Sequence, residues 1–178
     1  MLSTRDIVSI ALFAALTAAL GLFPPITLPT GVPITAQSMG VMLAGALIGA
    51  RRGGLALLLF AVLVAIGLPL LAGGRGGIGI YFGPTAGFVL SWPIAAYVTG
   101  WLFDKHRGQP HPAISALYLI IGGIGVVYVI GWAWLAVMNG WDIAKTFTVA
   151  LPFIPGDLVK VALTVVIARG VKKAIPNL

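Results

Sequence analysis

Two ionisable side chains open the apolar stretch PFIPGDLVKVALTVVI, residues 152–167. Asp157 and Lys160 are three residues apart, so on an α-helix their side chains lie on the same face. A charge at the centre of a bilayer costs about 2.5–3.5 kcal/mol, and such residues usually face the interior of a helix bundle. The pair therefore predicts a functional site inside a bundle. A structural interpretation stays open, in which Asp157 caps the helix and Lys160 extends to the membrane surface.

A glycine-rich segment, LAGGRGGIGIYFGPTAG at residues 71–87, is the second candidate. Glycine lets backbone N–H and C=O groups approach a bound molecule closely. The glycines expected to do so are Gly73, Gly74, Gly76 and Gly77. The aromatic residues expected to form the apolar walls are Tyr81, Phe82 and Phe88. No βαβ context surrounds the segment, so nucleotide binding is not predicted, and a flexible turn between two helices remains the alternative.

Catalytic and metal-binding sets are missing from the sequence. Its four acidic residues are all aspartate, and it has no cysteine. The two histidines, His106 and His111, fall in a polar loop that contains proline, where solvated histidines are the norm. We therefore expect neither an enzyme nor a metal or other cofactor in this chain. The net charge of +7 comes from Lys and Arg scattered through short segments, which predicts control of membrane orientation and no nucleic-acid binding.

The elements that position these residues must be transmembrane helices. The sequence is 60% hydrophobic and 8% charged, whereas about a quarter of the residues are charged in soluble domains. A bilayer-spanning helix needs roughly 20 apolar residues, so the length fits about six spans and leaves no soluble domain. We predict an all-α integral membrane protein, a compact bundle of six transmembrane helices that forms a single domain over residues 1–178. The predicted spans are 7–23, 37–50, 54–71, 84–103, 113–138 and 157–170.

The basic residues predict the orientation of these spans, because Lys and Arg of short loops stay on the cytoplasmic side. A cytoplasmic N-terminus places eight of them inside, namely Arg5, Arg51, Arg52, Lys105, Arg107, Arg169, Lys172 and Lys173. Arg75 and Lys145 then lie outside, and Lys160 lies in a helix. Both termini are therefore predicted to be cytoplasmic.

Small residues recur along the first predicted span, ALFAALTAAL at residues 11–20. One stripe contains Ala11, Ala15 and Ala19, and an adjoining stripe contains Ala14 and Ala18. This spacing lets another helix approach closely. The partner helix belongs either to another protein or to the same bundle, and the spacing favours neither.

Three tryptophans, Trp132, Trp134 and Trp141, fall near the outer end of the fifth predicted span. Because tryptophan is enriched at membrane–water interfaces, we interpret them as interface anchors. Stacking against a ligand is the alternative.

The segments LPLLAGGRGGIGIYFGPTAGF and LPFIPGDLVK together resemble the BioY family, the biotin-binding S components of energy-coupling factor (ECF) vitamin transporters. The likeness extends over nearly the whole chain and includes the alanine-rich first helix. It implies a multi-pass protein of the prokaryotic cytoplasmic membrane that captures biotin outside and releases it inside. It also implies that the first helix binds a transmembrane T subunit, which couples the chain to two ATPase subunits. The ATP would be used by those partners, and this chain would need no cofactor.

The same resemblance suggests how biotin would be held. Asp157 would accept a hydrogen bond from the ureido N–H groups, and Lys160 would donate one to the ureido oxygen. Arg75 would receive the carboxylate or help to close the pocket. The glycine backbone of residues 73–77 and the three aromatic residues would complete the site. The alternatives are a different vitamin, such as thiamin or riboflavin, and a membrane scaffold that transports nothing.

Overall fold

Helices make up nearly all of the computed structural model, which describes residues 2–27, 33–106 and 108–175. The α-helices are α1 (Thr4–Leu20), α2 (Gln37–Ala65), α3 (Ala86–Asp104), α4 (Pro112–Leu119), α5 (Val127–Asn139), α6 (Ile143–Ala150) and α7 (Ile154–Ala174). The other helical elements are the 3₁₀ helices η1 (Ile78–Phe82) and η3 (Leu151–Phe153) and the π-helix η2 (Ile120–Val126). Two short antiparallel strands, β1 (Ile26–Thr27) and β2 (Pro33–Ile34), pair with each other. The prediction of an all-α protein is confirmed.

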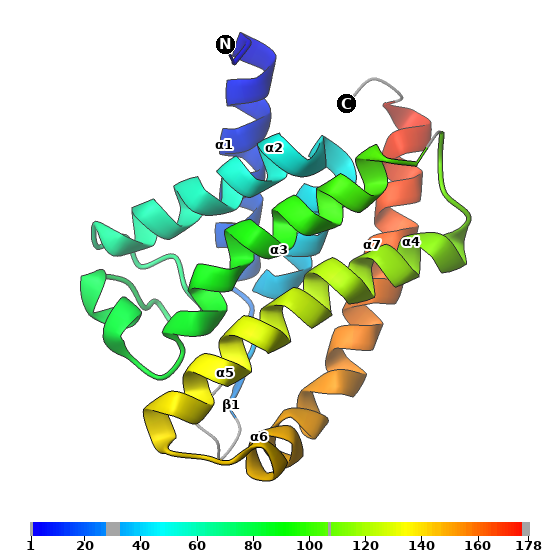
Figure 1. Cartoon of the computed structure of the whole chain (residues 1–178). Coiled ribbons are helices and arrows are strands. Elements are labelled where there is room, and N and C mark those ends of the chain that lie inside the picture. Colours follow the sequence, from blue (N-terminus) through cyan, green and yellow to red (C-terminus); the bar gives the residue numbers. More distant parts are fainter. Residues whose placement is uncertain (1, 28–32, 107, 176–178) are drawn as a thin grey trace.

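Four helical stretches are long and apolar enough to cross a membrane, namely α2, α3, residues 112–139 and residues 143–174. The third stretch is continuous because η2 joins α4 to α5, and the fourth because η3 joins α6 to α7. The 17 residues of α1 give a length of about 25 Å, slightly less than the ~30 Å apolar layer of a bilayer. Figure 1 shows the start of α1 and the end of α7 at the same end of the molecule, as expected for an even number of crossings.

A break inside α2 divides this helix into two arms. Gly49 has φ 77° and ψ −179°, a conformation that glycine adopts and that residues with a Cβ avoid. The N–H of Ala50, at the start of the second arm, donates to Oδ2 of Asp104 at the end of α3 (2.9 Å). Asp104 thus caps the second arm from another helix. The arms correspond to the predicted second and third spans, and a sharp turn replaces the loop expected between them.

The first arm of α2 lies in the centre of the bundle, where Met42 is fully buried. Small residues bring its neighbours close. A Cβ on Gly40 would collide with Thr17 of α1, and a Cβ on Gly45 would collide with Thr99 of α3. Close backbone approach therefore holds these three helices together, as is common in membrane proteins.

The π-helix η2 sets the direction in which α5 presents its side chains. Its Gly122 packs on Thr99, and its Gly123 packs on Met42. Each residue of an α-helix turns the chain by about 100°, so the extra residue in a π turn rotates everything that follows by about that angle. Because of this rotation, the buried face of α5 points in nearly the same direction as the buried face of α4. The rotation thereby determines where Tyr128 and Trp132 point.

Candidate functional site

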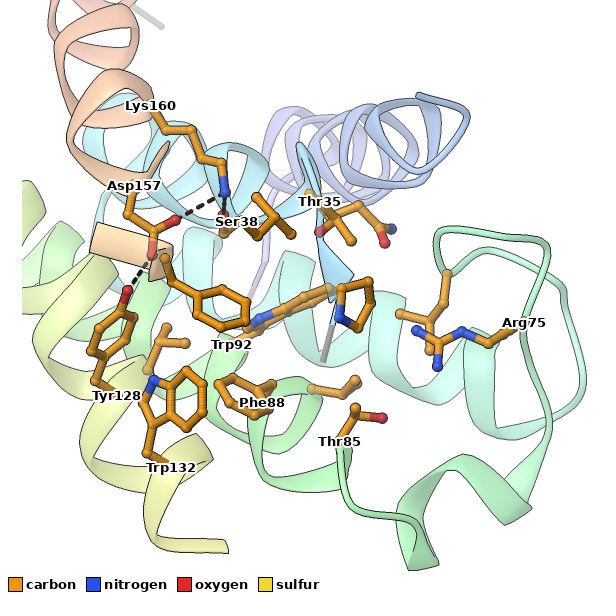
Figure 2. A pocket seen from close by; sticks show the side chains of 17 residues that line it. Thr35, Ser38, Arg75, Thr85, Phe88, Trp92, Tyr128, Trp132, Asp157 and Lys160 are labelled. Carbon is orange, nitrogen blue, oxygen red and sulfur yellow. Dashed lines mark hydrogen bonds and ion pairs between the residues drawn. The ribbon is translucent and has the colours of Figure 1, made fainter. Parts of the chain in front are cut away.

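A cavity of about 90 Å³ lies among segments that are far apart in the sequence (Figure 2). Its walls come from residues 33–35, 37 and 38, from Leu71 and Arg75, from Thr85 and Phe153, and from the first two turns of α3, α5 and α7. Charged groups are found at two places, the Asp157–Lys160 pair and Arg75, and Figure 2 shows aromatic side chains between them. A mostly apolar lining with a few placed polar groups is typical of small-molecule sites.

Asp157 and Lys160 form an ion pair at the cavity wall, with Lys160 Nζ 2.9 Å from Asp157 Oδ1. Lys160 Nζ also donates to Ser38 Oγ of α2 (2.9 Å), and the hydroxyl of Tyr128 of α5 donates to Asp157 Oδ2 (2.7 Å). Only 13% of the aspartate side chain and 14% of the lysine side chain are exposed. The two therefore share a helix face inside the bundle, and Lys160 does not extend to the membrane surface.

The start of α7 differs from the prediction. The helix begins at Ile154, three residues before the predicted start, so Asp157 lies in its first turn and is not its N-cap. A negative charge in the first turn interacts favourably with the helix dipole. Asp157 is therefore not explained as an N-cap residue. Its negative charge is nevertheless favourable in the first turn of α7.

The ion pair has hydrogen-bonding capacity to spare. An ammonium group has three N–H donors, and Lys160 uses two of them on Asp157 and Ser38. A carboxylate has about four acceptor positions, of which Tyr128 and Lys160 occupy two. Within the described part of the chain, one donor and further acceptor positions remain for a ligand that carries both N–H and C=O groups.

The next turn of α7 closes the cavity on the side facing the chain termini. Thr164 lies one turn beyond Lys160, and its hydroxyl is 4.0 Å from the sulfur of Met42. Both side chains are fully buried, as is Leu119 of α4. Packed side chains thus separate the cavity from the end of the molecule where α1 begins.

Aromatic side chains form one wall of the cavity. The ring of Trp132 makes edge-to-face contacts with Phe88 (centroids 5.3 Å apart) and Phe153 (5.0 Å), and a third with Tyr128 (5.9 Å). Trp132 is only 4% exposed. The interpretation of Trp132 as an interface anchor is therefore wrong, because the rotation of α5 after η2 turns this side chain inward. Trp134 is half-buried and donates to the carbonyl oxygen of Gly83 (3.0 Å), which fastens the segment before α3 to α5.

A small hairpin presents Arg75 to the cavity. Leu71 and Arg75 exchange two backbone hydrogen bonds of 3.0 and 3.2 Å, and the turn between them contains Gly73 (φ 79°) and Gly74 (φ 68°). Both angles lie in the left-handed region, where glycine is favoured. The side chain of Arg75 then folds back, so that Nε donates to the carbonyl oxygen of Ala72 (3.3 Å). We refer to residues 71–75 as the Arg75 hairpin.

Four of the ten predicted ligand-binding residues line the cavity, namely Arg75, Phe88, Asp157 and Lys160. The other six do not, and they are Gly73, Gly74, Gly76, Gly77, Tyr81 and Phe82. These residues shape the surrounding loop. A Cβ on Gly76 would collide with the carbonyl oxygen of Leu68, and the N–H of Gly77 donates to Val64 of α2 (2.8 Å). The hydroxyl of Tyr81 donates to the carbonyl oxygen of Ala61 in α2, and burial raises the pKa of Tyr81. Phe82 is 74% exposed.

Several residues at the cavity were not anticipated from the sequence. Among them are Gln37, Ser38, Trp92, Tyr128 and Phe153, all of which contribute to its lining. Gln37 and Ser38 could have been noticed, since they are consecutive polar residues at the start of an apolar span. Tyr128 gave no comparable signal because it lies within a long apolar run.

The two alanine stripes of α1 face in different directions. Ala14 is 3% exposed and belongs to the hydrophobic core, and Ala18 packs against that core. Ala11, Ala15 and Ala19 are exposed. One stripe thus serves the packing of this bundle, and the other remains on its surface.

Comparisons with known proteins identify relatives over the whole length of the chain. Residues 1–177 match the model of the BioY family. The chain is 47% identical to a Rhizobium etli protein named biotin transporter BioY, with 99% of this chain and 98% of that protein covered. A Rhodobacter capsulatus protein of the same name is also 47% identical, with 97% and 96% covered. The crystal structure of the S-component for biotin from an ECF-type ABC transporter is similar with a TM-score of 0.90 at 30% identity, covering 97% of this chain and 95% of that one. The relatives are named as transporters and not as enzymes.

Proposed function

The chain belongs to the BioY family, and we propose that it takes up biotin across the prokaryotic cytoplasmic membrane as the S component of an ECF transporter. The names of the relatives support biotin as the ligand, and so does the likeness to a crystallised S-component for biotin. The observation in this chain that carries the proposal is the buried Asp157–Lys160 pair at one end of an aromatic cavity.

A gain in fold stability is a weak explanation for this pair. Taking a charge out of water costs several kcal/mol, and replacing a buried ion pair by apolar residues is often neutral or stabilising. A ligand explains it better. The ureido ring of biotin is neutral and has two N–H donors and one carbonyl acceptor. Asp157 accepts from a ureido N–H in our proposal, and Lys160 donates its remaining N–H to the ureido oxygen. Such charge-assisted hydrogen bonds are about twice as strong as neutral ones.

The carboxylate of biotin is assigned to Arg75. Figure 2 shows Arg75 on the opposite side of the cavity from the ion pair. The pair as a whole is neutral, whereas Arg75 forms no ion pair with any residue in the described ranges. This polarity suits a long ligand with a neutral ring at one end and a negative charge at the other. Phe88 and Trp132 then enclose the apolar middle of the molecule.

The transport partners are proposed to bind on the first helix. The exposed stripe Ala11, Ala15 and Ala19 gives a helix of the T subunit room to approach α1 closely, while the buried stripe keeps α1 attached to its own bundle. The T subunit in turn connects the chain to two ATPase subunits. The ATP is hydrolysed there, and this chain uses no cofactor.

The proposed orientation places both termini in the cytoplasm and the Arg75 hairpin outside the cell. The basic residues at the end of α7, Lys172 and Lys173, then lie on the cytoplasmic side, in agreement with the positive-inside rule. The exposed apolar side chains of the transmembrane helices contact membrane lipid.

Calorimetry with the purified protein in detergent tests the proposal directly. We expect biotin to bind with a one-to-one stoichiometry, and thiamin and riboflavin to give no heat. Binding of thiamin or riboflavin in place of biotin would overturn the assigned substrate. A folded protein that binds none of the three would overturn the assigned substrate and leave another vitamin or a scaffold as the alternatives.

A further inference from the structure

Gln37 is buried where three segments of the chain meet, and its side-chain amide makes three hydrogen bonds there. Only 1% of the residue is exposed. Its Nε2 donates to the carbonyl oxygens of Thr17 in α1 (3.2 Å) and of Leu70 (3.0 Å), and its Oε1 accepts from the N–H of Ala72 (2.9 Å). All three partners are backbone groups. The three bonds therefore depend on the amide of Gln37 and not on the side chains of its partners.

These bonds attach the Arg75 hairpin to the end of α1. Leu70 and Ala72 flank Leu71, which is one of the two paired residues of the hairpin. Ala72 in turn accepts the hydrogen bond from Nε of Arg75. A continuous chain of hydrogen bonds thus runs from α1 through Gln37 and Ala72 to the guanidinium group. Gln37 and Arg75 both line the cavity, so this connection passes along its wall.

The opposite side of the hairpin is open. A Cβ built on Gly73 or on Gly74 would have no neighbour within 4 Å. The inner side is tight, because a Cβ on Gly21 at the end of α1 would meet both the carbonyl oxygen of Leu70 and Nε2 of Gln37. The hairpin is therefore fastened on the side of Gln37 and unsupported at its turn.

We propose that Gln37 is a positioning residue that holds the Arg75 hairpin against α1, and that recognition of the ligand carboxylate by Arg75 depends on it. This inference rests on the proposed binding of biotin. It adds the uncharged residue Gln37 to the residues on which that binding depends. A glutamine fits the position because an amide supplies two N–H donors and an acceptor from one side chain. A leucine here would leave two carbonyl groups and one N–H unpaired in a buried place.

The test compares biotin with biotinamide, in which the carboxylate is replaced by a neutral carboxamide. Calorimetric titrations with both ligands are made for the wild type, Gln37→Leu, Arg75→Ala and the double variant. Each single variant should weaken biotin binding about tenfold, as expected for the loss of one hydrogen bond to a charged group. Binding of biotinamide should change by less than about twofold. The double variant should bind biotin no more weakly than Arg75→Ala, because the two residues act through one contact.

A merely structural role of Gln37 gives a different pattern. Both ligands would then be weakened equally, and the effects of the two substitutions would add, which overturns the proposal. Unchanged affinity of Gln37→Leu for both ligands overturns it as well. The matched control is Gln109→Leu, since Gln109 is exposed and, among the residues that the structure describes, its amide hydrogen-bonds only to the carbonyl oxygen of Arg169, at 3.5 Å. This control should bind both ligands as the wild type does.

Hydrogen exchange without ligand separates this inference from the proposed function. In Gln37→Met, which keeps the length of the side chain and serves if the leucine variant does not fold, the amide of Ala72 should exchange faster than in the wild type. Unchanged exchange of this amide would overturn the role of Gln37 even if biotin binds. A wild-type protein that ignores biotin would overturn the proposed function and leave the exchange result valid.

Discussion

The hydroxyl of Tyr128 donates to one oxygen of Asp157 at 2.7 Å, while the other oxygen of the same carboxylate pairs with Lys160. The carboxylate is thereby fixed from α5 and from its own helix, α7. The lysine is held from a further helix, because its Nζ also donates to Oγ of Ser38 in α2 at 2.9 Å. The orientation of the ion pair thus depends on three helices.

Removing the hydroxyl of Tyr128 should loosen the carboxylate and weaken the binding of biotin. For Tyr128→Phe we expect a loss of about five- to thirtyfold, which corresponds to ~1–2 kcal/mol for one hydrogen bond to a charged group. Calorimetry with the purified variant measures this change. The control is Tyr118→Phe, because the hydroxyl of Tyr118 lies near His106 (3.4 Å), away from the cavity. Equal affinities of Tyr128→Phe and the wild type would contradict a role for this contact.

Neutralising Asp157 should have a larger effect. Asp157→Asn leaves the ammonium group of Lys160 without its charged partner, and removing one member of a buried pair costs about 2–5 kcal/mol in binding, which is at least ~30-fold in affinity. Lys160→Met should be similarly severe. The double variant should lose less than the sum of the two, since the pair acts as a unit. Biotin binding by Asp157→Asn at wild-type strength would remove this residue from the site.

The crossing of α2 and α3 should tolerate no added methyl group at Gly100. A Cβ on Gly100 would collide with the backbone of Gly49 and Ala50, at the break in α2. Gly100→Ala should therefore destabilise the protein by about 1–3 kcal/mol, the usual cost of overpacking. Gly170→Ala is the matched control, because Gly170 is an exposed helical glycine with no neighbour within 4 Å of an added Cβ. Thermal unfolding in detergent compares the two variants. Equal unfolding midpoints would contradict the prediction, because α2 and α3 would then accommodate the added methyl group.

Substitutions on the two sides of α1 should separate folding from assembly. Ala15 is exposed, so Ala15→Trp should keep the fold and the affinity for biotin but prevent co-purification with a T subunit. Ala14 is buried in the core, so Ala14→Trp should lower the unfolding temperature instead. A T subunit that co-purifies with Ala15→Trp would place its binding surface elsewhere.

The helices and the ion pair could be predicted because their signals are local. Apolar runs of sufficient length indicate spans, and the spacing of Asp157 and Lys160 places both on one helix face. A boundary between two spans was predicted at residues 50–54, but its form, a sharp turn at Gly49 with no loop, could not be predicted in the same way. It depends on a hydrogen bond between residues 54 positions apart, from Ala50 to Asp104.

The remaining cavity residues depend on geometry that the sequence does not reveal. Trp132 and Tyr128 point inward because the π-helix η2 rotates α5, and no periodicity in a uniformly apolar run indicates such a turn. The glycine-rich segment is recognisable in the sequence as unusual. Its glycines nevertheless shape the turn that carries Arg75 and do not line the cavity themselves.

The packed layer formed by Thr164, Met42 and Leu119 has a consequence for transport. As long as these side chains stay together, biotin has no straight passage through the protein. In the proposed uptake of biotin, a molecule that enters from outside would then depart by the same entrance, which would face the cytoplasm at some stage of each cycle. The bundle would tilt or turn as one body within the bilayer, and under the proposed coupling to ATPase subunits their hydrolysis of ATP would drive this movement.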